Sequence, residues 1–70
     1  MIEVGDKVKW AGVQDGRCAP GFHGEVEKIS YRDENSLRVM WKERGSYTWE
    51  RRKNLVFDDT GEQPALVLVA

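Results

Sequence analysis

The sequence has few of the features that secreted, membrane-spanning or disulfide-bonded proteins need. It holds one cysteine, Cys18, so an internal disulfide is excluded, and a lone thiol favours a reducing, cytoplasmic compartment. No signal-like segment opens the chain. Its longest apolar run, residues 65–70, is far shorter than the roughly 20 residues of a membrane-spanning helix. We therefore expect a soluble protein without membrane contact.

Patterns for catalysis and cofactor binding are also missing. Cys18 and His23 lie five residues apart, but no second pair of ligands accompanies them, so we expect no metal site. Nothing in the sequence orients His23 as a base toward Cys18. There is no phosphate-binding loop and no dinucleotide fingerprint. These absences predict a protein that is not an enzyme and uses no cofactor.

The chain is short and nearly neutral. Seventy residues allow one hydrophobic core, and a core of this size leaves little stability for a deep pocket. The formal net charge of -1 points to no class of partner. Because the chain begins at Met1 and carries no tag or linker, we expect a complete small protein that binds through its surface.

What the sequence does contain is a series of short segments in which polar and apolar residues alternate. No stretch has the apolar spacing of an amphipathic helix. Val26 and Ile29 are three residues apart, which predicts a bulge between them. The segments predict strands at 6–10, 24–31, 37–41, 47–51 and 56–57, a loop at 11–23, a 3-10 turn at 52–55 and an additional strand at 65–69.

This pattern predicts an all-β, five-stranded SH3-like barrel over residues 1–57 with a long first loop. Residues 58–70 are expected to form a turn and an apolar tail that packs on the barrel or extends it. The segments Gly5 to Val8, Gly21 to Ile29 and Leu37 to Val39 resemble the KOW and Tudor types of SH3-like barrel. Gly24 and Val26 match the start of the second KOW strand, and Asn54-Leu55 is similar to the end of Tudor domains. The resemblance implies a non-catalytic module that binds nucleic acid, ribosomal or transcription components, or peptides.

The chain is rich in aromatic residues. Trp10, Trp41 and Trp49 each lie on the apolar side of a predicted strand, so we assign them to the core. Loops or strand ends carry the three other candidates, which would contact a partner or hold a methylated cation: Phe22, Tyr31 and Tyr47. The alternative is that these three also pack inside.

Basic residues are concentrated in the middle of the chain. Residues 28–53 carry eight basic and four acidic side chains, whereas the rest of the chain carries three and eight. Arg38, Met40 and Lys42 are expected to point outward, with Thr48 and Glu50 beside them. The candidate phosphate contacts are Arg38, Lys42, Arg44, Arg51, Arg52 and Lys53. The alternative is that these are solvated charges that discourage aggregation.

Recognition of a protein or peptide is the function that the sequence favours. Loops held by a rigid barrel are frequent sites of binding, and the loops at 11–23, 32–36 and 43–46 would form the contact rim. The alternative is DNA or RNA binding through the basic hairpin at 38–53. A third hypothesis is self-association through the tail strand at 65–69.

Overall fold

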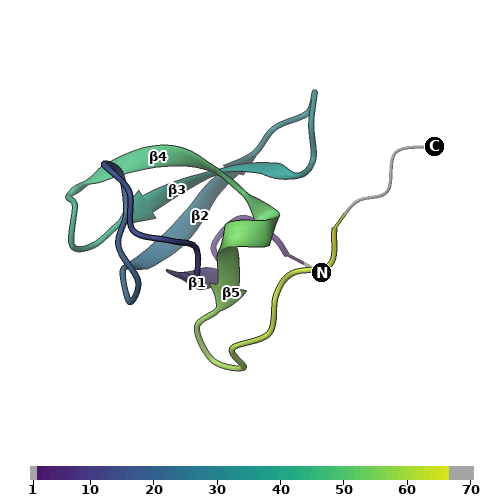
Figure 1. The fold of residues 1–70 in the computed structure, drawn as a ribbon. Helices are drawn as coiled ribbons and strands as arrows, with labels where there is room; N and C mark the ends of the chain where they lie inside the picture. The colour runs from purple at the N-terminus through teal and green to yellow at the C-terminus, as the bar shows by residue number, and fades with distance from the viewer. Residues whose placement is uncertain (1, 67–70) are drawn as a thin grey trace.

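The computed structural model describes residues 2–66, and these form one antiparallel sheet of five strands (Figure 1). The elements in chain order are β1 (Lys7–Trp10), β2 (His23–Ile29), β3 (Ser36–Trp41), β4 (Ser46–Arg51), the 3-10 helix η1 (Arg52–Asn54) and β5 (Leu55–Phe57). Hydrogen-bonded neighbours follow the order β4-β3-β2-β1-β5. The expected all-β class, the long first loop and the 3-10 turn are therefore confirmed.

Among residues 2–66, the two strands at the ends of the strand order, β4 and β5, each pair with one neighbour only. Within residues 2–66, no ladder of hydrogen bonds joins β4 to β5, although η1 connects these strands directly along the chain. Figure 1 shows η1 between them. The additional strand expected at 65–69 falls mostly outside the described residues, and residues 65 and 66 belong to no strand.

The register of β2 and β3 places the apolar side chains of both strands on one side of the sheet. Val26 lies opposite Val39 and Ile29 lies opposite Leu37, with a register shift between Val26 and Lys28. This shift is the bulge that the three-residue spacing predicted. Because of the extra residue, both apolar side chains of β2 face the core.

The core lies on the inner side of this sheet. Val8, Val26, Leu37, Val39 and Leu55 are fully buried there, together with the indole rings of β1 and β3. Those two rings, from Trp10 and Trp41, meet edge to face with centroids 6.2 Å apart. Both tryptophans were expected in the core, and their burial confirms it.

The predicted orientation of β4 was wrong. Trp49 is 44% exposed, whereas Thr48 and Glu50 are buried on the inner side. Two hydrogen bonds on the inner side accompany the inversion, one from a buried donor and one to a buried carboxylate. The Thr48 hydroxyl accepts a hydrogen bond from Trp41 Nε1 at 2.7 Å, and the Glu50 carboxylate accepts one from Arg17 Nε at 3.0 Å. Buried polar groups need partners, so polar residues of β4 face inward.

The long loop between β1 and β2 is attached to the inner side of β4. Arg17 binds Glu50 through two nitrogens, and the Cys18 thiol lies 3.9 Å from the Glu50 carboxylate. Burial raises the pKa of Cys18. Asp15 accepts hydrogen bonds from the backbone N–H groups of Cys18 and Arg17, which lower the pKa of its carboxyl group. These contacts hold the loop beneath the sheet and leave the outer side of β4 uncovered by it.

Candidate partner-binding surface

Large apolar side chains are exposed together on the outer side of β3 and β4. Met40 lies directly opposite Tyr47, and Arg38 lies directly opposite Trp49. Opposite residues of an antiparallel pair project to the same side of the sheet. Tyr47 and Trp49 are 50% and 44% exposed, and Met40 is 36% exposed. We call this surface the hairpin face; its side chains are Arg38, Met40, Tyr47, Trp49 and Arg51.

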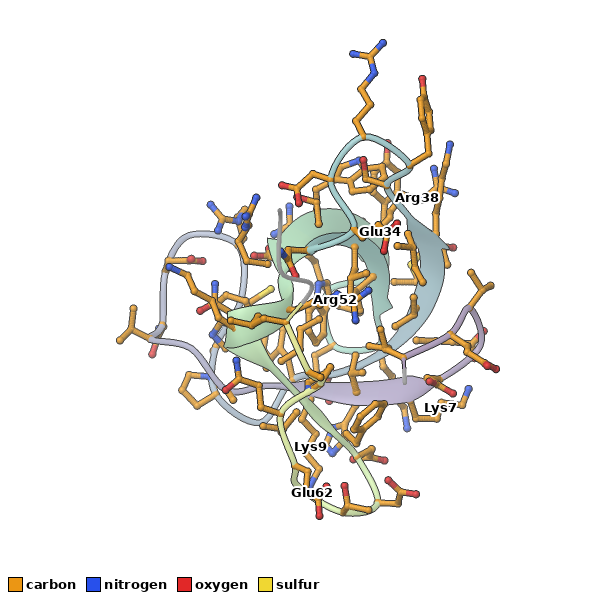
Figure 2. All side chains as sticks on the ribbon, turned by 90° about the vertical axis from the view of Figure 1, so that its right-hand side faces the viewer. Lys7, Lys9, Glu34, Arg38, Arg52 and Glu62 are labelled. Carbon is orange, nitrogen blue, oxygen red and sulfur yellow. The ribbon has the colours of Figure 1, made fainter. Side chains whose placement is uncertain are left out.

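The arginine of β3 is packed against the hairpin face. The Arg38 guanidinium carbon lies 5.0 Å from the centroid of the Tyr47 ring, within range of a cation–π interaction. Its Nε lies 3.1 Å from a carboxylate oxygen of Glu27, an ion pair without the angles of a hydrogen bond. Figure 2 shows the side chain of Arg38 on the outside of the sheet. Glu27 therefore neutralises the charge of Arg38 locally.

The second arginine of the hairpin face, Arg51, also forms an ion pair with a carboxylate. Arg51 Nη1 donates a hydrogen bond to Asp33 at 2.6 Å and another to the Ser36 hydroxyl at 3.2 Å. The pKa of Asp33 is lowered by the backbone N–H of Asn35, and Arg51 adds to this effect. The hairpin face is thus an aromatic surface whose two cations already have carboxylate partners.

The three aromatic residues expected to bind a partner do not lie together. Tyr47 belongs to the hairpin face. The Phe22 ring is partly buried on the inner side, where its centroid lies 6.4 Å from the centroid of the Trp41 ring. Tyr31 is 81% exposed after the end of β2, where the Arg32 guanidinium carbon lies 5.7 Å from its ring. Because Phe22 and Tyr47 lie on opposite sides of the sheet, the three rings cannot form one cage.

The six basic residues expected to form one patch are also separated. Arg38 and Arg51 lie on the hairpin face, and Lys42 and Arg44 lie in the turn before β4. Lys53 is exposed on η1, but Arg52 is 5% exposed, contrary to its expected place on the surface. Its Nε donates to the carbonyl of Glu34 at 2.6 Å, and its Nη1 donates to the carbonyl of Ala65 at 3.3 Å. Figure 2 shows Arg52 beside Glu34.

Sequence reasoning missed Trp49 as a surface residue. Alternation places Tyr47 and Trp49 on one side and Thr48 and Glu50 on the other, and this part of the prediction is confirmed. Hydrophobicity then favoured the aromatic pair for the core. The contrary signal was Arg17, whose partner Glu50 is distant in the sequence. No local pattern could have revealed that pairing.

Outside the hairpin face, the fold of residues 2–66 shows a hollow but neither a cluster of metal ligands nor a membrane-spanning helix. No three side chains of His, Cys, Asp or Glu lie close enough in this range to hold a metal ion. No helix in the same range is long and apolar enough to cross a membrane. An open hollow of about 570 Å³ lies among Ile2, Ile29, Tyr31 and Leu66, and the other side chains with polar groups that line it are Ser30, Glu34 and Arg52.

Comparisons with known proteins do not assign a function. No family model, no curated protein and no solved structure matches the chain. The hairpin face is therefore the feature on which a functional assignment depends.

Proposed function

We propose that this protein is a non-catalytic module that recognises a protein or peptide partner through the hairpin face. The observation that carries the proposal is the exposure of Tyr47 and Trp49 side by side on a strand, next to Met40. Tryptophan, tyrosine, methionine and arginine are the residues enriched at protein interfaces. Their positions on paired strands fix their backbone before a partner arrives, which lowers the entropic cost of binding.

The charges around the face favour a protein over a nucleic acid. Phosphate contacts supply most of the affinity for DNA and RNA, and they require cations that are free to bind. Arg38 and Arg51 are paired with Glu27 and Asp33, and Arg52 is buried. The candidate cations without an ion pair among residues 2–66, namely Lys42, Arg44 and Lys53, lie before and after β4 and do not form one patch on the hairpin face. The net charge of -1 adds no general attraction for phosphate.

The fold that we propose for the module is an SH3-like barrel of the KOW or Tudor type. The strand order, the long loop between β1 and β2 and the 3-10 helix before β5 support this proposal. The resemblance of residues 3–57 to those families supports it as well. A barrel of this kind would leave the β3–β4 hairpin as a rigid platform for recognition.

A displayed library of random peptides, selected against the immobilised full chain, tests the proposal. Selected peptides should bind the Trp49→Ser variant at least tenfold more weakly, because the exposed indole supplies the central contact. Tyr31→Ser is the matched control, since Tyr31 is an exposed aromatic residue outside the hairpin face. Peptides should bind this control as tightly as they bind the unchanged protein.

Two results would contradict the proposal. One is a set of selected peptides whose affinity depends on Tyr31 and not on Trp49. The other comes from an amide chemical-shift titration with short single-stranded and duplex DNA and RNA at low and moderate salt. Salt-sensitive shifts confined to residues 38–53 would assign the hairpin to nucleic-acid binding instead.

A further inference from the structure

The outer edge of β4 carries backbone hydrogen-bonding groups that no other strand pairs within residues 2–66. We propose that the partner is an extended peptide with acidic ends, which adds to β4 as a sixth, antiparallel strand. This inference rests on the proposed function and specifies the conformation and the charge of the partner. Its basis is the set of backbone groups that β4 leaves unpaired.

The hydrogen-bond pattern shows which backbone groups of β4 point away from β3. The Arg52 N–H donates to the carbonyl of Asn35 at 2.9 Å, one step beyond the opposed pair Ser36 and Arg51. Bonded and non-bonded pairs alternate along an antiparallel ladder. The N–H and C=O groups of Tyr47, Trp49 and Arg51 therefore point toward the free edge, and no residue within 2–66 bonds them.

The same three residues bear side chains of the hairpin face. A peptide strand bonded to Trp49 would place the residue opposite it on the same side of the sheet as the indole ring. Alternate side chains of the peptide would then contact Tyr47 and Trp49, and the backbone would supply hydrogen bonds of the kind used when a peptide augments a sheet. Figure 1 shows β4 at the margin of the sheet, and no other strand of residues 2–66 lies beyond it.

The charges at the two ends of β4 select an acidic partner. Arg44 precedes the strand and Lys53 follows it, and neither has a carboxylate partner among residues 2–66. Lys42, in the turn before β4, is likewise without an ion pair in this range. Glutamates at both ends of a bound strand would meet these cations. A second copy paired antiparallel along β4 would instead bring Arg44 of one chain toward Lys53 of the other, which is repulsive.

A synthetic peptide of sequence Glu-Glu-Val-Thr-Val-Thr-Val-Glu-Glu is the probe, titrated into the labelled full chain. Valines would lie on the hairpin face, so their N–H groups would point to β4. N-methylation of the valine amides should therefore weaken binding at least tenfold, whereas N-methylation of the threonine amides should leave it unchanged. Hydrogen exchange should slow at the amides of Tyr47, Trp49 and Arg51 when the peptide binds.

Charge reversal tests the acidic ends. The Arg44→Glu/Lys53→Glu variant should bind the same peptide at least fivefold more weakly, and a probe with lysines in place of its glutamates should regain that loss. The exposed residue Lys7, on β1 and separated from β4 by β2 and β3, gives the control variant Lys7→Glu, which should bind like the unchanged protein.

The outcomes separate this inference from the proposed function. Equal binding of the two methylated peptides, with a continued dependence on Trp49, would overturn strand addition and leave the hairpin face as a side-chain surface. Failure of the probe to bind, while library peptides bind through Trp49, would also overturn strand addition and leave the proposed function standing. Protection of the β4 amides that depends on protein concentration, without peptide, would assign the edge to a second copy and overturn the inference.

Discussion

At Thr48, a small polar side chain occupies a place on the inner side of the sheet that a hydrophobic residue would ordinarily take. Its hydroxyl is the acceptor for the buried Trp41 Nε1. Thr48→Val keeps the volume but leaves the indole N–H unpaired, so the free energy of unfolding should fall by about 1–3 kcal/mol. Urea denaturation measures this loss.

Thr48→Ser is the control, because serine retains the acceptor oxygen. It should retain most of the stability that Thr48→Val loses. A Thr48→Val variant as stable as the unchanged protein would show that the hydrogen bond between Trp41 and Thr48 is not needed in the fold.

Glu43 makes the fold sensitive to acid. Its carboxylate accepts hydrogen bonds from the His23 ring at 2.9 Å and from the His23 backbone N–H at 2.7 Å, and these lower its pKa from 4.5 to about 2. Because the folded pKa lies below the unfolded value, the stabilisation is complete above about pH 4.5 and is lost as the pH falls through about 2.

Glu43→Gln should therefore be less stable than the unchanged protein at pH 6, and the two should converge as the pH approaches 2. Thermal unfolding across this range gives the comparison. Glu62→Gln, at an exposed carboxylate after β5, is the control and should keep the pH profile unchanged. A constant difference between Glu43→Gln and the unchanged protein at every pH would contradict the assignment.

At the scale of the elements, β2 and β3 depend on the absence of a side chain at Gly24. A Cβ there would lie 2.4 Å from Val39 Cγ1 and 2.9 Å from the carbonyl oxygen of Met40. Gly24→Ala should lower the free energy of unfolding by about 1–3 kcal/mol, because neither strand can move without disturbing the core.

Gly16→Ala is the matched control for this prediction. Gly16 lies in the long loop, and a Cβ there meets no atom within 4 Å. Denaturation of the two variants in parallel separates crowding from the general effect of replacing a glycine. Equal losses in both variants would contradict the close approach of β2 and β3.

The strands themselves were predictable from local patterns. Alternation located β1, β3 and β4 to within a residue at each end, and the odd spacing of Val26 and Ile29 located the bulge in β2. Alternation does not say which side of a strand is buried. For β4 that choice depends on Arg17, Trp41 and their partners Thr48 and Glu50, which come together only in the folded sheet.

At the scale of the whole molecule, Arg52 joins three segments: η1, to which it belongs, the β2–β3 turn and the stretch after β5. Its guanidinium binds the carbonyl of Glu34 in the β2–β3 turn and the carbonyl of Ala65 after β5, and its backbone N–H binds the carbonyl of Asn35. Arg52→Leu would remove both hydrogen bonds of the buried guanidinium and leave the carbonyl groups of Glu34 and Ala65 without this donor, so the free energy of unfolding should fall by about 1–3 kcal/mol.

Lys53→Leu tests whether the loss of any positive charge on η1 lowers the free energy of unfolding as much as Arg52→Leu does. Lys53 is exposed, and the same substitution there should change stability by less than about 0.5 kcal/mol. Chemical denaturation of both variants provides the measurement. Similar losses at the two positions would show that Arg52 does not join the three segments.

The candidate site was less predictable than the fold for the same reason. Basic residues near one another in the sequence, such as Arg51, Arg52 and Lys53, are distributed between the hairpin face, the interior and η1. The aromatic residues Phe22 and Tyr47 are on opposite sides of the sheet. Proximity in the sequence could not place either set in space.

The three tryptophans give this molecule two independent optical signals. Trp10 and Trp41 are buried with their rings at 86° to one another, an arrangement whose coupled transitions contribute to circular dichroism when the core is intact. Trp49 is accessible to water, so iodide quenches its fluorescence while sparing the buried pair. Without any attached dye, dichroism would thus report folding, and shielding of Trp49 from iodide would report occupancy of the hairpin face.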